Sequence, residues 1–210
     1  AVGAAALALA SAPATAEIKI GVTVSTTGPA AALGIPEKNM IELWPKELNG
    51  EKVTVIVLDD AGDPSQATTN ARRFVNDEKV DIIMGSSTTP PSNAVAGVAF
   101  EANVPHFALG PVALAPGREK MTFVLPQETK LMAGGIFKYM KSKGLNNVGM
   151  IGFSDSWGDQ WVGQFKAQAE PIGMKLTNDE RYARADTSVT GQALKRSEEH
   201  TSELQSLRHL

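Results

Sequence analysis

Apolar residues along the chain fall into two patterns, short β-branched runs and longer stretches with helical spacing. The runs predict strands over residues 18–24, 53–58, 80–84, 105–109, 123–125, 148–153 and 174–182. Apolar residues three and four positions apart predict helices over residues 34–48, 64–75, 91–102, 129–143 and 157–172. Strands that alternate with helices at this spacing indicate parallel sheets with crossover helices, so the predicted fold class is α/β.

Local signals place the ends of several elements. Asp63, Pro64 and Gln66 have the order of an N-cap, a first helical residue and a capping-box partner. Pro45 is expected to kink or end the first helix early. The strands are continuous apolar runs without alternation, which is typical of burial on both faces. Ligands of such sheets bind beyond the carboxyl ends of the strands.

The most informative segment at that edge is GSSTTPPSN, residues 85–93, which places four hydroxyls directly after the third strand. Proline at a first helical position loses no hydrogen bond, and N–H groups at a helix start together with hydroxyls suit a carboxylate. One Ser or Thr would be explained by ordinary N-capping, whereas four in a row favour an anion site. No side chain in the segment is acidic, basic or able to activate a nucleophile, which predicts binding without catalysis.

Composition and missing motifs narrow the function classes. The 210-residue chain is 42% hydrophobic, has a net charge of -3 and shows no basic stripe, so we expect no nucleic-acid partner. It has no cysteine, which excludes disulfides, thiolate metal sites and a cysteine nucleophile. Phosphate loops, G-x-S-x-G and H-E-x-x-H are absent, so we expect neither an enzyme nor a cofactor. Asp59, Asp60 and Asp63 lack the spacing of a calcium loop and are expected to form turns and caps, so no metal is predicted.

The two ends of the chain differ from its middle. Residues 1–16 are an Ala/Leu-rich run that ends in Ala-Thr-Ala, as in the remnant of a cleavable signal peptide, which predicts export and a mature start near Glu17. Residues 196–210 contain RSEEHTSELQS, which resembles the in-frame translation of a sequencing-library adapter and predicts a non-native tail. The alternatives are a genuine N-terminal helix and a genuine polar C-terminal helix.

Five segments carry a family resemblance through their order and spacing. They are IKIGVTVSTTGPAAALG (18–34), VIVLDDAGDPSQA (55–67), VDIIMGSSTTPPSNAV (80–95), PHFALGP (105–111) and MIGFSDSWGDQW (150–161). Together they resemble the periplasmic solute-binding proteins of ABC importers, of the type that binds branched-chain amino acids. The resemblance covers residues 18 to about 195.

The resemblance implies a type 1 periplasmic-binding-protein fold, with two α/β lobes joined by hinge strands and the ligand between them. It implies an N-terminal lobe over residues 17–126 and an incomplete second lobe over residues 127–195. In this family lobe closure follows ligand binding and is read by the membrane permease. We therefore expect a periplasmic monomer whose partners are a small carboxylate or amino-acid ligand and an ABC permease in the inner membrane.

The resemblance also implies a set of ligand-binding residues. These are Gly85, Ser86, Ser87, Thr88, Leu33, Val112, Ala113 and Trp157. The first four match the loop that holds the ligand's carboxylate and amino group in this family. Val112 and Ala113 match a second loop, which here lacks a hydroxyl that amino-acid binders commonly use. Leu33 matches a position that is often aromatic, and Trp157 matches a pocket aromatic or packs against the sheet.

Two ligand classes and two contexts stay open. A branched-chain or other hydrophobic amino acid fits the resemblance, and so does an aromatic carboxylate of the kind derived from lignin. The same lobes also occur as ligand-binding domains of receptors. An export signal with a soluble domain favours the transport component.

Overall fold

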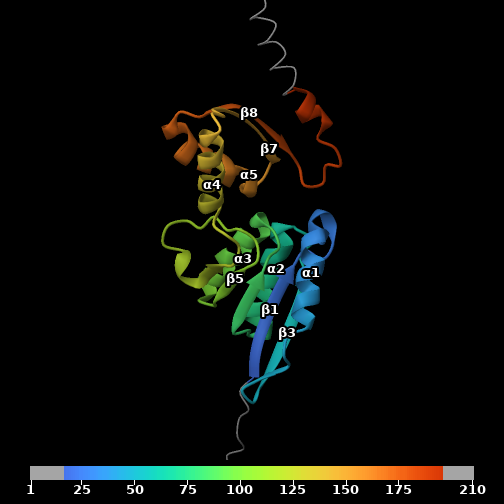
Figure 1. Ribbon diagram of the computed structural model, residues 1–210. Helices are drawn as coiled ribbons and strands as arrows, with labels where there is room; N and C mark the ends of the chain where they lie inside the picture. Colours follow the sequence, from blue (N-terminus) through green and yellow to red (C-terminus); the bar gives the residue numbers. More distant parts are fainter. Residues whose placement is uncertain (1–16, 196–210) are drawn as a thin grey trace, which may run out of the picture.

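The computed structural model describes residues 17–195, which form two parallel sheets with helices packed on them (Figure 1). The larger sheet has the strand order β2-β3-β1-β4-β5-β6 and the smaller one pairs β7 with β8. All neighbouring strands are parallel except β2 and β3. The predicted α/β class with parallel sheets is therefore confirmed.

The strands are β1 (Glu17–Val24), β2 (Glu47–Leu48), β3 (Glu51–Asp59), β4 (Ile82–Gly85), β5 (His106–Ala108), β6 (Thr122–Val124), β7 (Asn147–Phe153) and β8 (Lys175–Tyr182). The α-helices are α1 (Ala31–Glu42), α2 (Pro64–Arg73), α3 (Thr89–Ala102), α4 (Thr129–Ser142) and α5 (Ser156–Gln164). Wider π-helical turns continue α2 over Phe74–Glu78 and α5 over Phe165–Ala169. Short 3-10 turns lie at Gly28–Ala30, Glu119–Met121 and Glu170–Ile172.

The larger sheet is buried on both faces. Successive residues of a strand point to opposite faces, so Val22 and Val24 of β1 pack toward Ile41 of α1. On the other face α2 and α3 enclose a second cluster that contains Phe74 and Ile83. Burial on both faces explains why these strands are continuous apolar runs.

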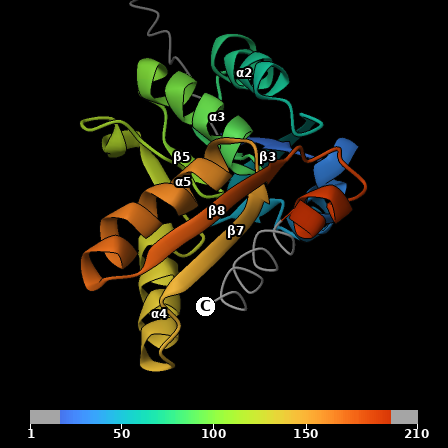
Figure 2. The same ribbon diagram turned by 90° about the horizontal axis from the view of Figure 1, so that it is seen from above.

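The smaller sheet is covered by α4 and α5, which lie along β7 and β8 (Figure 2). Phe137 of α4 meets Phe165 at the end of α5 edge to face, with ring centroids 5.4 Å apart. Val148 of β7 and Leu176 of β8 pack against the same cluster. This unit thus has a hydrophobic core of its own.

The first helix starts earlier than the predicted residue 34, and it ends before Pro45, which confirms the expectation that this proline ends it early. The helix α1 starts at Ala31 and stops at Glu42, because Pro45 disfavours the helical conformation in the residue before it. Leu48 belongs instead to β2, which forms a hairpin with β3. Asn49 and Gly50 connect the two strands with φ angles of 52° and 83°. An Asn-Gly pair is a typical two-residue hairpin turn, so the sequence did contain the signal.

The N-cap of α2 is confirmed, but the capping box is not. The Asp63 carboxylate accepts a hydrogen bond from the backbone N–H of Gln66 at 2.7 Å. The Gln66 side chain donates to Asn70 at 3.0 Å instead of reaching back to the N-cap. The N–H of Asp63 donates to the carbonyl of Asp60 at 2.8 Å, so that donor is already paired.

The predicted signal-peptide remnant (1–16) and the predicted tail (196–210) lie outside the described residues. Within residues 17–195, no helix is both long and apolar enough to cross a bilayer.

Phe74 is expected to be a main support of the first lobe. It is fully buried against Ala67 and Ile83, so Phe74→Ala should lower the free energy of unfolding by about 3–5 kcal/mol through lost contacts and the cavity left behind. The exposed Tyr139 offers the matched control, and Tyr139→Ala should cost less than about 1 kcal/mol. Urea denaturation of both variants measures this; equal losses would contradict the assignment.

Candidate ligand-binding site

The carboxyl ends of β1, β3, β4 and β5 lie at the edge of the larger sheet that faces the second lobe (Figure 1). In parallel α/β sheets this edge is where ligands bind. The segments that follow these strands contain most of the predicted site residues.

Gly85 ends β4 in a conformation that requires glycine. Its φ is +116°, and a Cβ there would lie 1.8 Å from the carbonyl oxygen of Thr23. The close approach of β4 to β1 at this point turns the following residues, Ser86 and Ser87, toward the end of β1. The sequence predicts Gly85 as a site residue, but it does not reveal the close contact with Thr23 that excludes any side chain there.

His106 of β5 supports the same strand end. Its Nε2 donates to the carbonyl of Gly85, so in the neutral ring Nδ1 accepts from the Thr122 hydroxyl at 3.2 Å. Burial lowers the pKa of His106 to about 4, against the opposing effect of the hydrogen bond to Gly85. His106 therefore fastens β4 to β5 and β6 as a neutral side chain.

A fully buried carboxylate, Asp60, joins the loops after three strands. Its oxygens accept hydrogen bonds from the hydroxyls of Thr23 (2.8 Å), Ser25 (2.7 Å) and Ser86 (2.6 Å). The backbone N–H of Gly62 donates a fourth bond at 3.0 Å. A buried charge is tolerated when its hydrogen bonds with water are replaced in this way. The expectation that these aspartates form turns and caps agrees with this geometry.

A second carboxylate, Glu37 of α1, holds the next serine. The Ser87 hydroxyl donates to Glu37 Oε2 and accepts from the backbone N–H of Ser25 at 3.0 Å. Burial raises the pKa of Glu37; the hydrogen bond from Ser87 opposes this shift, and the Asp60 charge adds to it. The proton of Ser86 goes to Asp60 and that of Ser87 to Glu37, so neither hydroxyl has a free proton for an anion.

Thr88 and Thr89 differ from the two serines. These residues are only 4% and 1% exposed, yet neither Oγ1 has a hydrogen-bond partner among residues 17–195. Thr88 is the N-cap of α3 but makes no side-chain cap bond. Helical positions two and three are Pro90 and Pro91, which have no N–H. The sequence predicts several free N–H groups at this helix start, but of the first three helical residues only Thr89 has an N–H.

Asn93, one turn after Thr89 on α3, links both lobes. Its Oδ1 accepts from the backbone N–H of Ala113 at 3.0 Å, and its Nδ2 lies 3.4 Å from the Ser156 hydroxyl at the start of α5. Asn93 was not among the predicted site residues. The spacing of four residues from Thr89, which places both on one helix face, is the signal that could have found it.

The remaining predicted residues lie in different places. Val112 and Ala113 line a cavity of about 570 Å³ between β6, the start of α4 and α5. Trp157 lines another, of about 440 Å³, beside β7 and β8. Leu33 is 50% exposed on α1, one turn before Glu37. The residues from Gly85 to Thr88 line neither of these two cavities.

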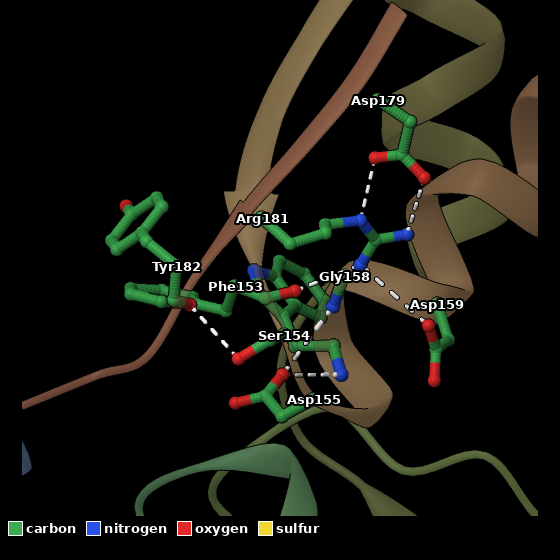
Figure 3. A network of polar contacts seen from close by, with 9 residues as sticks. Phe153, Ser154, Asp155, Gly158, Asp159, Asp179, Arg181 and Tyr182 are labelled. Atoms are coloured by element: carbon green, nitrogen blue, oxygen red, sulfur yellow. Dashed lines mark hydrogen bonds and ion pairs between the residues drawn. The ribbon is translucent and has the colours of Figure 1, made fainter. Parts of the chain in front are cut away.

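The second lobe presents charged groups around the start of α5 (Figure 3). Asp155 caps this helix by accepting from the N–H of Trp157 at 2.8 Å, and its other oxygen accepts from Arg184 at 2.6 Å. Arg181 reaches from β8 to the carbonyl of Phe153 at 2.8 Å (Figure 3). The positive end of α5 is thus already occupied by a side-chain carboxylate of its own chain.

Among residues 17–195, no group of three or more His, Cys, Asp or Glu side chains could hold a metal ion. Asp60 and one oxygen of Glu37 accept hydrogen bonds from hydroxyl and N–H donors. Hydrogen-bonding groups are therefore what the described residues of this edge offer chemically.

Known proteins resemble this chain in both sequence and architecture. The family model described as "Periplasmic binding protein" matches residues 17–200. The chain belongs to the periplasmic binding protein family. The Leu/Ile/Val-binding protein BraC3 of Rhizobium johnstonii is 31% identical over 179 residues, which cover 78% of this chain and 47% of that protein.

Two solved structures have the same fold. An extracellular ligand-binding receptor from Rhodopseudomonas palustris is 54% identical, with a TM-score of 0.82 over 86% of this chain and 50% of that one. A solute-binding protein of an ABC transporter from R. palustris, in complex with 4-hydroxybenzoate, is 26% identical, with a TM-score of 0.73 over 87% of this chain and 51% of that one. The chain spans about half the length of these relatives. The type 1 periplasmic-binding-protein fold is confirmed.

Asp60 should be far more important for stability than its neighbour Asp63. Asp60→Ala leaves the hydroxyls of Thr23, Ser25 and Ser86 without their acceptor, and we expect a loss of about 3–5 kcal/mol in the free energy of unfolding. Asp63→Ala removes one exposed N-cap bond and should cost about 1 kcal/mol. Chemical denaturation compares the two, and a smaller loss for Asp60 would refute its role as the hub.

His106 should make folding sensitive to acid. Between its ordinary pKa of 6.5 and the folded value of about 4, the unfolded chain binds a proton that the folded chain does not, so stability falls as the pH decreases. The expected loss from pH 7 to pH 4 is about 3 kcal/mol. Urea denaturation at a series of pH values should show this loss in the wild type and a correspondingly smaller one in His106→Gln. Parallel pH profiles would contradict it.

Proposed function

We propose that this chain contains the N-terminal lobe and part of the second lobe of a periplasmic solute-binding protein that captures a small hydrophobic carboxylate for import by an ABC permease. Membership of the periplasmic binding protein family supports the binding role. The importer context is supported by the relative described as a solute-binding protein of an ABC transporter. The ligand would lie between the lobes, and the protein would act as a periplasmic monomer without catalysis.

The choice of a carboxylate rests on two buried threonine hydroxyls that have no hydrogen-bond partner in the described part of the chain. A buried polar group without a hydrogen bond costs about 1–3 kcal/mol, and native structures contain few of them. Thr88 and Thr89 place two such groups side by side after β4, at the sheet edge where ligands of this fold class bind. A bound carboxylate would accept from both hydroxyls and remove this cost.

The energetics of such a site are sufficient for useful affinity. Burying a carboxylate costs several kcal/mol unless its hydrogen bonds with water are replaced. Each hydrogen bond to a charged group contributes about 1.5–3 kcal/mol, so two hydroxyls and the N–H of Thr89 can offset the cost. Apolar contact with Leu33 and Trp157 would then supply much of the net binding energy. A micromolar dissociation constant needs only about 8 kcal/mol.

Two ligand classes remain candidates because each has a relative that supports it. The Rhizobium relative is described as a Leu/Ile/Val-binding protein, which favours a hydrophobic amino acid. The neighbour solved with 4-hydroxybenzoate favours an aromatic carboxylate. The R. palustris protein at 54% identity is described as an extracellular ligand-binding receptor, so a receptor domain is the alternative context.

The threonine hydroxyls can be tested on the protein at full length. Thr88→Val and Thr89→Val keep the shape of the side chain but remove the donor, and each should weaken binding of the preferred carboxylate by about tenfold or more. Calorimetry with leucine, 4-methylpentanoate, benzoate and 4-hydroxybenzoate would identify that ligand and measure the loss.

Thr68→Val is the matched control, because the Thr68 hydroxyl is exposed on α2 and bonds to the carbonyl of Pro64. This variant should bind like the wild type. If Thr88→Val and Thr89→Val also bind like the wild type, the proposed carboxylate site is wrong.

A further inference from the structure

One carboxylate oxygen next to the proposed site has no hydrogen-bond partner among the residues that the structure describes. Glu37 lies half-buried on α1, and its Oε2 accepts the proton of Ser87. No hydrogen bond or ion pair from residues 17–195 reaches Glu37 Oε1. The two charged neighbours on the same helix, Lys38 and Glu42, pair with each other at 3.7 Å.

The surroundings of Glu37 add no positive charge. The charged group that faces it from the loop after β3 is Asp60, which has the same sign. The loop after β4, residues 86–91, contains no ionisable side chain. Burial raises the pKa of Glu37, so its ionised form is less stable here than in water. A donor placed on Oε1 would stabilise that form, and hydrogen bonds with one charged partner are the stronger kind.

We propose that Glu37 is a specificity-determining residue, whose Oε1 accepts a hydrogen bond from a donor group of the ligand. This inference rests on the proposed function, in which Thr88 and Thr89 bind the ligand's carboxylate. The ligand is then a small acid with a second, hydrogen-bond-donating group. An ammonium group and a phenolic hydroxyl share this chemistry.

The proposal predicts that the site rejects simple acids. When the lobes close, Oε1 loses contact with water. A ligand that lacks a donor leaves this oxygen unpaired, and sites built to pair with a donor discriminate strongly against analogues without one. The serine hydroxyls cannot compensate, because Ser86 and Ser87 already donate to Asp60 and Glu37.

Matched ligand pairs test this by calorimetry on the full-length protein. Leucine is compared with 4-methylpentanoate, and 4-hydroxybenzoate with benzoate, so the members of each pair differ only in the donor. In one of the pairs the wild type should bind the donor-bearing member at least about tenfold more tightly. The pair that shows this preference distinguishes an ammonium from a phenol as the source of the donor.

Glu37→Gln is the decisive variant. Its amide oxygen can still accept from Ser87, while an NH₂ group, itself a donor, replaces Oε1. The preference should fall by about tenfold, and the member without a donor should bind as well as before or better. Glu42→Gln, on the same helix but exposed, should leave the preference unchanged.

Four outcomes would overturn the inference. An unchanged preference in Glu37→Gln, or equal weakening of both members, shows that Glu37 has only a structural role. Equal binding of both members by the wild type removes the inference and leaves the proposed function standing. Binding of none of these acids removes both. Glu37→Asp, which keeps the charge but shortens the side chain, gives a second measurement if Glu37→Gln does not fold; its preference should be reduced.

Discussion

The site depends on one buried charge, that of Asp60. A carboxylate without water must be surrounded by donors, and the donors here come from the ends of β1, β3 and β4. This requirement draws three loops together that are far apart in the sequence. The loop after β4 therefore has a fixed conformation before any ligand arrives, which lowers the entropic cost of binding.

The same interaction divides the four hydroxyls of this loop into two pairs. Ser86 and Ser87 donate to carboxylates of the protein, whereas Thr88 and Thr89 donate to nothing in the described part of the chain. A row of chemically similar residues thus has two tasks. The serines position the loop, and in the proposed function the threonines would donate to the ligand.

The sequence predicts the layered α/β fold because burial on both faces imposes continuous apolar runs. The sequence does not predict the hairpin of β2, because the apolar spacing that ends at Leu48 indicates a helix and competes with the turn signal of Asn49 and Gly50. At the site, hydroxyl-rich residues after a buried strand could be recognised from the sequence. Their division could not, because the partners of Ser86 and Ser87 lie 26 and 50 positions away and come from tertiary packing.

The starts of α3 and α5 differ in a way that supports the proposed anion site at α3. At α5, Asp155 and Arg184 already pair with each other, and Asp155 caps the helix, so an incoming carboxylate would meet a like charge. At α3 the cap position holds the neutral Thr88, whose hydroxyl is unpaired. Asn93 connects the two helix starts through Ser156. In the proposed function, the unit of the larger sheet would therefore supply the donors, and Trp157 beside the smaller sheet would add apolar contact without competing for the charge.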